Sequence, residues 1–104
     1  MSEWIAVTSV RGFEPGSRET FELDGIQALL LNADGEYFAI EDKCSHAEVE
    51  LNSGAVEGDT IACPLHGAKF CLRSGKALTP PAYEDIETFP VRVVDGVIEV
   101  KEAD

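Results

Sequence analysis

The sequence predicts an all-β domain, and three observations support this. Two Asp-Gly dipeptides, Asp24-Gly25 and Asp95-Gly96, each stand between two short apolar runs, and a third turn signal ends at Asp34-Gly35. Such dipeptides favour the tight turn of a β-hairpin. The apolar runs are short, and no long window repeats its apolar residues with the 3.6-residue period of a helix. Short strands joined by turns are therefore the expected structure.

The expected strands follow one another along the chain, with turn residues between them. The first precedes an irregular stretch that contains Gly12, Pro15 and Gly16. Short runs rich in β-branched, aromatic and aliphatic residues, bounded by such turn residues, are typical of strands. The expected strands are Trp4–Val7, Thr20–Leu23, Ile26–Leu31, Tyr37–Glu41, Ala55–Glu57, Thr60–Ala62, Lys69–Leu72, Val91–Val94 and Val97–Lys101.

The middle of the chain has a different composition. Residues 42–83 contain all three cysteines and both histidines, and they end near Pro80-Pro81. A chain of 104 residues is long enough for one ordinary domain and too short for two. We therefore expect a single domain, 1–104, with a base formed by 1–41 and 84–104 and a small subdomain, 42–83, inserted into it.

The charge of the chain limits its partners. Twenty acidic against eight basic residues give a net charge of −12. Nucleic acid and anionic lipid are therefore excluded as expected partners, because their phosphates would be repelled. The charge has two open interpretations, ordinary solubility and steering toward a basic surface on a partner protein.

The sequence carries no targeting signal that we recognise. Its longest apolar run, Ala28 to Leu31, is far shorter than the roughly 18–20 residues that a membrane span needs. The start, Met1 to Trp4, has neither the basic nor the apolar region of a secretory signal. A cytoplasmic location is expected, where three cysteines are better explained by metal ligation than by disulfides.

Two short loops carry the expected chemistry. They are Cys44-Ser45-His46 and Cys63-Pro64-Leu65-His66-Gly67, with 16 residues between His46 and Cys63. Each loop offers one thiolate and one imidazole. In zinc fingers the cysteines usually form one close pair and the histidines another, so this mixed pairing favours a binuclear iron centre over a zinc site. In such a centre both cysteines bind one iron and both histidines bind the other.

This pattern resembles the Rieske signature. The similarity extends through Gly54-Ala55-Val56, Gly58-Asp59 and the segment Phe70 to Lys76, and the whole chain resembles the ferredoxin components of bacterial aromatic-ring-hydroxylating dioxygenase systems. The resemblance implies the Rieske fold, an antiparallel β-sandwich base with a cluster-binding subdomain. It implies one [2Fe-2S] cluster per chain, held by Cys44, His46, Cys63 and His66.

The resemblance also implies the role of the chain. It would be a monomeric electron carrier, not an enzyme, that passes single electrons from a flavin reductase to a terminal oxygenase. High-potential Rieske proteins carry an extra cysteine in each loop and a serine after the second loop's glycine. Here Leu65 and Ala68 stand at two of these positions, and none of Ala47, Glu48 and Val49 is a cysteine, so a low-potential cluster is expected.

Several other residues near the loops have expected roles. Gly67 is expected to adopt a positive φ or to approach the cluster closely, and Cys71 to be a small buried side chain on a strand. Pro80-Pro81 resembles the proline loop that covers the cluster in this family. Glu48, Glu50 and Glu57 either surround the histidine ligands as a docking surface or are ordinary solvated residues.

Three other classes of protein and one other kind of metal site share part of the pattern. The small subunit of an assimilatory nitrite reductase has the same fold and is the main alternative function. The catalytic oxygenase subunits would need a further iron site with two histidines, and no histidine follows His66. A membrane-anchored respiratory subunit is disfavoured because the disulfide cysteines and the anchor are missing. A tetrahedral zinc site is the remaining alternative for the four ligands.

Overall fold

The structure is a computed structural model that describes residues 3–44, 49–65, 67–80 and 84–102. These residues form ten strands and no helix, so the all-β prediction is confirmed. No helix long and apolar enough to cross a membrane occurs in the described part of the chain. The strands are β1 (Ile5–Ser9), β2 (Arg18–Leu23), β3 (Ile26–Ala33), β4 (Glu36–Glu41), β5 (Val56–Glu57), β6 (Thr60–Ala62), β7 (Lys69–Cys71), β8 (Thr88–Phe89), β9 (Val91–Val94) and β10 (Val97–Val100).

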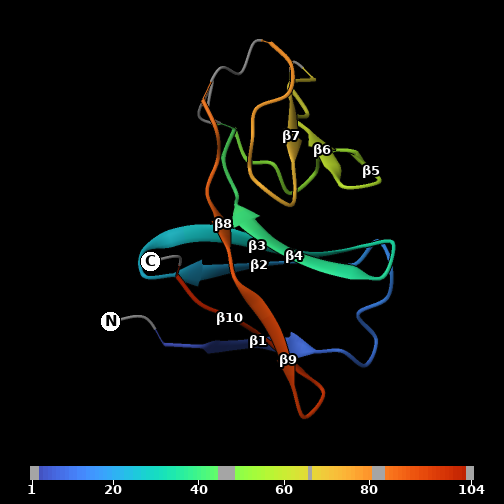
Figure 1. Cartoon of the computed structure of the whole chain (residues 1–104), viewed down its shortest axis with the longest axis vertical. Helices are drawn as coiled ribbons and strands as arrows, with labels where there is room; N and C mark the ends of the chain where they lie inside the picture. Colours follow the sequence, from blue (N-terminus) through green and yellow to red (C-terminus); the bar gives the residue numbers. More distant parts are fainter. Residues whose placement is uncertain (1–2, 45–48, 66, 81–83, 103–104) are drawn as a thin grey trace.

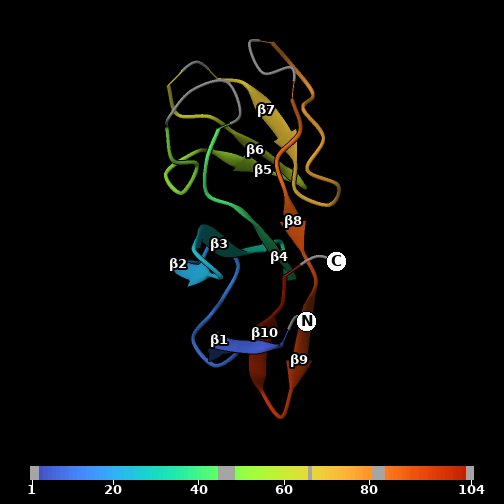
Figure 2. The same cartoon turned by 90° about the vertical axis from the view of Figure 1, so that its left-hand side faces the viewer.

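The strands form three antiparallel sheets that are stacked along the longest axis of the molecule (Figure 1). The lowest sheet has the order β1-β10-β9, the middle sheet β2-β3-β4-β8 and the upper sheet β5-β6-β7. The turned view in Figure 2 shows the same three levels. Because β1 pairs with β10, the first and last strands lie side by side in the lowest sheet. Cys44 and Cys63, the two predicted ligands that the structure describes, lie in the core shared by the middle and upper sheets.

Three hairpins turn at the Asp-Gly dipeptides. The aspartates have φ values of 52° at Asp24, 57° at Asp34 and 50° at Asp95, and the glycine that follows each one is also at positive φ. Two successive residues with positive φ define a type I′ turn, whose twist matches that of the paired strands. The two hairpins predicted at Asp24-Gly25 and Asp95-Gly96 are therefore confirmed. The turn predicted at Asp34-Gly35 also joins paired strands, β3 and β4.

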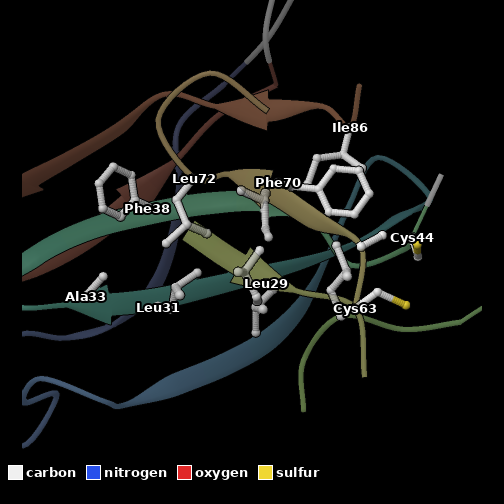
Figure 3. Close-up of a cluster of buried hydrophobic side chains, with 13 residues drawn as sticks. Leu29, Leu31, Ala33, Phe38, Cys44, Cys63, Phe70, Leu72 and Ile86 are labelled. Carbon is white, nitrogen blue, oxygen red and sulfur yellow. The ribbon is translucent and has the colours of Figure 1, made fainter. Parts of the chain in front are cut away.

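Strand β3 is buried on both faces and divides the interior into two cores. Alternate residues of a strand point to opposite faces. Leu29 and Leu31 accordingly pack upward with Phe70 and Leu72 of the upper part, as Figure 3 shows. Ala28 and Leu30 belong to the other core, which extends to Ile98 and Val100 of the lowest sheet. The middle sheet therefore supports the upper one directly.

The upper sheet shares a core with the base. Strands β5 to β7 fall within 42–83, but their buried side chains pack on β3 and β4. Polar contacts also join the two parts. Arg73 makes two hydrogen bonds to Glu36, of 2.6 and 2.9 Å, which hold the pKa of the Glu36 carboxyl below its usual value. Arg18 donates to the backbone oxygen of Asn52 at 2.6 Å. We therefore keep the division into a base, 1–41 and 84–104, and a cluster-binding subdomain, 42–83, as a proposal, since the two parts share one core.

The sequence patterns did not predict β8. This strand has only two residues, Thr88 and Phe89, and it extends the middle sheet by pairing with Ile40 and Ala39. It is too short to show an alternating pattern, and Pro90 follows it at once. Its position depends on β4, which lies far away in the sequence. The ends of the predicted strands also differ from the observed ones by one or two residues, as is usual.

Truncating Phe70 tests the shared core. Phe70 is fully buried between the upper sheet and β3, so Phe70→Ala is expected to lower the free energy of unfolding by about 3–5 kcal/mol. Leu78→Ala is the control, because Leu78 is 49% exposed and its truncation should change stability by less than about 0.5 kcal/mol. Urea unfolding followed by circular dichroism measures both. Equal effects of the two substitutions would contradict the shared core.

Candidate metal centre

Two cysteines from different sheets meet at one end of the upper core. Cys44 follows β4 of the middle sheet, and Cys63 directly follows β6 of the upper sheet. Their exposed fractions are 0% and 2%, and both belong to the same buried cluster. Figure 3 shows both sulfur atoms at the same end of this cluster. The fold thus brings together the two predicted thiolate ligands.

The two loops are closed by the same hydrogen bond. The backbone N–H of Cys44 donates to the oxygen of Val49 at 2.7 Å, and that of Cys63 donates to the oxygen of Ala68, also at 2.7 Å. In each loop the acceptor lies five residues after the cysteine. Each closed segment contains one predicted histidine ligand, His46 or His66. These two histidines lie outside the described residues.

The second loop has an additional turn at its end. The N–H of Gly67 donates to the oxygen of Cys63 at 2.9 Å, and Gly67 has φ 73°. This confirms the positive φ expected there. Ala68 is fully buried, whereas Leu65 is 56% exposed. The residue that replaces the disulfide cysteine of high-potential proteins is therefore at the surface.

Close packing of Gly54 holds the two loops next to each other. A Cβ atom at this position would lie 2.0 Å from the backbone oxygen of Ala62 and 3.1 Å from that of Leu51. Ala62 immediately precedes Cys63, and Leu51 follows the end of the first loop. Only glycine allows this approach without displacement of one segment.

The first loop is held to the base by a buried carboxylate. Asp42 is 2% exposed. Its carboxylate accepts hydrogen bonds from the N–H of Leu51 at 2.8 Å, from Gln27 at 2.7 Å and from Asn52 at 2.9 Å. Sequence reasoning missed Asp42, because a charged residue after a strand is usually solvated. Its place two residues before Cys44, a predicted ligand, was the available signal.

Other predicted residues around the loops are only partly described. Glu50 and Glu57 are exposed, and the Glu50 carboxylate accepts a hydrogen bond from Gln27 at 2.6 Å. Pro80 is exposed. The backbone segment just before it runs beside β7, because the N–H of Leu78 donates to the oxygen of Lys69 at 2.8 Å. Glu48 and Pro81 lie outside the described residues.

Cys71 differs from its expected environment. It lies at the end of β7, as expected of a strand residue, but it is half-buried instead of fully buried. A hydrogen bond from the Ser74 side chain lowers the pKa of the Cys71 thiol, while partial burial acts in the opposite direction. Cys71 is not part of the buried cluster that contains Cys44 and Cys63.

The two thiols suit a metal that thiolates bind. They sit in an apolar core, where an unpaired thiolate would be costly, and iron of an iron–sulfur cluster provides the balancing positive charge. Their neighbouring loops each add an imidazole from the sequence. The fold and these predicted ligands are together typical of a small all-β iron–sulfur protein.

Comparison with known proteins agrees with this class. The sequence profile of the Rieske [2Fe-2S] domain matches residues 3–90. The chain therefore belongs to the Rieske [2Fe-2S] domain family, and a [2Fe-2S] cluster is its cofactor. Rieske centres carry electrons, so the chain is an electron-transfer component.

Individual relatives are ferredoxins. The chain is 50% identical over 70 residues to the 3-phenylpropionate/cinnamic acid dioxygenase ferredoxin subunit of Photorhabdus laumondii, a match that covers 66% of this chain and 67% of that protein. The structure of the Sphingomonas yanoikuyae ferredoxin matches with a TM-score of 0.87 at 26% identity. The match covers 97% of this chain and 100% of that ferredoxin. A further similar chain comes from the complex of reduced oxygenase and oxidized ferredoxin in carbazole 1,9a-dioxygenase. Its TM-score is 0.86 at 28% identity, over 93% of this chain and 91% of that one.

Adding one methyl group at Gly54 tests how the loops are held. Gly54→Ala is expected to push Ala62 and Leu51 apart and to lower the iron content of the purified protein by at least half. Gly58→Ala is the matched control, since a Cβ there meets no atom within 4 Å and only its positive φ costs about 1 kcal/mol. Iron per protein is measured in both variants. Full iron content in Gly54→Ala would contradict this role of Gly54.

Proposed function

We propose that the chain carries single electrons from a flavin reductase to a terminal aromatic-ring-hydroxylating oxygenase. The support comes from its relatives, which are ferredoxin subunits of aromatic dioxygenases. One of the similar structures is a ferredoxin in complex with its oxygenase. We further propose that it acts as a monomer in the cytoplasm. The main alternative, a nitrite reductase subunit, is not favoured because the relatives are dioxygenase components.

We infer that Cys44 and Cys63 bind one iron and that His46 and His66 bind the other. The observation that carries this inference is the matching closure of the two loops around Cys44 and Cys63. Because both buried thiols lie at the same end of one core, they can serve a single iron. The histidine of each loop is then left for the second iron, which is the ligand set of a Rieske centre.

The bound cluster would accept and release one electron. Imidazole ligands in place of two thiolates remove negative charge, which raises the potential above the roughly −400 mV of plant-type ferredoxins. The surroundings act in the other direction. Ala68 offers no hydroxyl to a cluster sulfur, and Leu65 cannot form a disulfide. We therefore propose a potential near the lower end of the Rieske range, about −150 mV.

The acidic surface would guide the partner. Glu50 and Glu57 are exposed and both follow the first loop in sequence, and Gln27 donates a hydrogen bond to the Glu50 carboxylate. A cleft of about 740 Å³ beside this loop is lined by Glu41, Asp42 and Glu50 among others. Such a surface suits brief docking of basic residues, with fast association that salt weakens.

Single substitutions test the ligand set. Cys63→Ser and His66→Ala are expected to abolish the [2Fe-2S] cluster, because each removes one of four ligands. Cys71→Ser is the matched control, and it should keep the full cluster because Cys71 lies outside the shared core. Visible absorption and iron analysis after reconstitution measure the cluster content. A cluster retained without His66 but lost without Cys71 would contradict the proposed ligands.

Small electron donors of opposite charge test whether the acidic surface near Glu50 and Glu57 affects electron transfer to the cluster. Reduction by cationic methyl viologen radical should slow as salt is added, and reduction by anionic dithionite should speed up, because screening weakens both effects. The double variant Glu50→Gln/Glu57→Gln is expected to reduce the cationic rate about threefold at low salt. Stopped-flow absorption measures the rates. Rates that do not depend on salt for either donor would contradict a role of the acidic surface in electron transfer.

A further inference from the structure

Asp42 is a charged side chain that is almost completely buried. With an exposed fraction of 2%, it is one of two polar side chains that are buried in the described part of the chain. The other, Asn32, donates to the oxygen of Phe13 and accepts from the N–H of Gly35, so it serves the irregular stretch before β2 and the turn after β3. Burial of a charge is costly unless it has good partners. Asp42 therefore calls for a functional explanation.

The contacts of Asp42 fit an ionised carboxylate. Its Oδ1 accepts from the N–H of Leu51, and its Oδ2 accepts from Gln27 and Asn52. All three partners are donors, whereas a protonated acid would need an acceptor for its own hydrogen. None of the three partners carries a formal charge, so these hydrogen bonds stabilise the negative charge without cancelling it.

These contacts also join both ends of the first ligand loop to the base. Asp42 comes two residues before Cys44, and Leu51 comes two residues after Val49, where the loop closes. The Asp42–Leu51 hydrogen bond thus forms a second closure around the Cys44–Val49 one. The N–H of Asp42 donates to the oxygen of Gln27 at 2.9 Å, which fixes this double closure to β3.

We propose that Asp42 is a positioning residue that fixes the first ligand loop and keeps a negative charge near the cluster, which lowers its reduction potential. This rests on the ligand set proposed above. The Cα atoms of two residues this close in sequence are at most about 7 Å apart, so we take about 10 Å as the separation between the Asp42 carboxylate and an iron held by Cys44. Reduction adds an electron to the cluster, and a nearby negative charge opposes that addition.

Neutralising Asp42 is expected to make reduction easier. A unit charge about 10 Å from the cluster, at an effective dielectric constant of about 20, changes the equilibrium constant for reduction of the cluster roughly tenfold. Asp42→Asn should therefore raise the equilibrium constant for reduction about tenfold, an upward shift of about 59 mV for one electron. Glu22→Gln is the control, because Glu22 is an exposed carboxylate paired with Gln27 across the hairpin. Its shift should be less than one third as large, and redox titration followed by visible absorption measures both.

Two further variants separate the charge from general damage to the loop. Asn52→Ala removes one donor and leaves the charge, so the potential should fall instead of rising. Asp42→Asn/Asn52→Asp moves the charge to the other end of the 2.9 Å hydrogen bond and should bring the equilibrium constant back to within about threefold of the wild type. Because Asn52→Ala keeps Asp42, it also tests the proposal if Asp42→Asn binds no cluster.

The outcomes distinguish this proposal from the ligand set. A shift in Asp42→Asn no larger than in Glu22→Gln, with the cluster intact, would overturn the role of Asp42. An upward shift in both Asp42→Asn and Asn52→Ala would also overturn it, because loop damage alone would then explain the data. Retention of the cluster in Cys63→Ser would instead overturn the ligand set. The redox titration of Asp42→Asn would still decide whether Asp42 lowers the reduction potential.

Discussion

Packing of the upper sheet against β3 and β4 forms the core that contains both cysteines. Leu29, Leu31 and Ile40 of these strands pack against the buried side chains of the upper sheet, and Cys44 and Cys63 belong to the same cluster. Because β3 is buried on its other face as well, it cannot shift without disturbing both cores. The relative position of the two thiols is therefore set by the packing of the whole domain.

Two matching loops convert this packing into a site for a cofactor. Each cysteine leads into a loop that closes onto a backbone oxygen five residues later. In the second loop this hydrogen bond continues the β6–β7 pairing by one residue, since Ala62 pairs with Lys69. Asp42 fixes the first loop by hydrogen bonds, and Gly54 lets the segments of the two loops approach each other because it has no side chain. The proposed cluster site is thus supported by packing and by hydrogen bonds.

Much of this structure could be predicted from the sequence, and the exceptions have physical reasons. The Asp24-Gly25 and Asp95-Gly96 hairpins were predictable because two successive positive φ angles demand such residues. The spacing of the cysteines and histidines likewise indicated the family, because each ligand motif is a short contiguous segment of the sequence. In contrast, β8 and the burial of Asp42 depend on partners distant in sequence. Cys71 is half-buried because successive residues of a strand point to opposite faces, and Phe70 takes the buried face. The ligand roles of His46 and His66 rest on the sequence.

The central claim is that one cluster binds a histidine from each loop. Pulsed EPR of the reduced wild-type protein, made with and without ¹⁵N-labelled histidine, tests this most directly. The account predicts two directly coordinated histidine nitrogens whose couplings change to those of ¹⁵N on labelling. A reduced [2Fe-2S] signal without histidine nitrogen coupling would contradict it, because two of the four ligands would then have to be other residues of the chain.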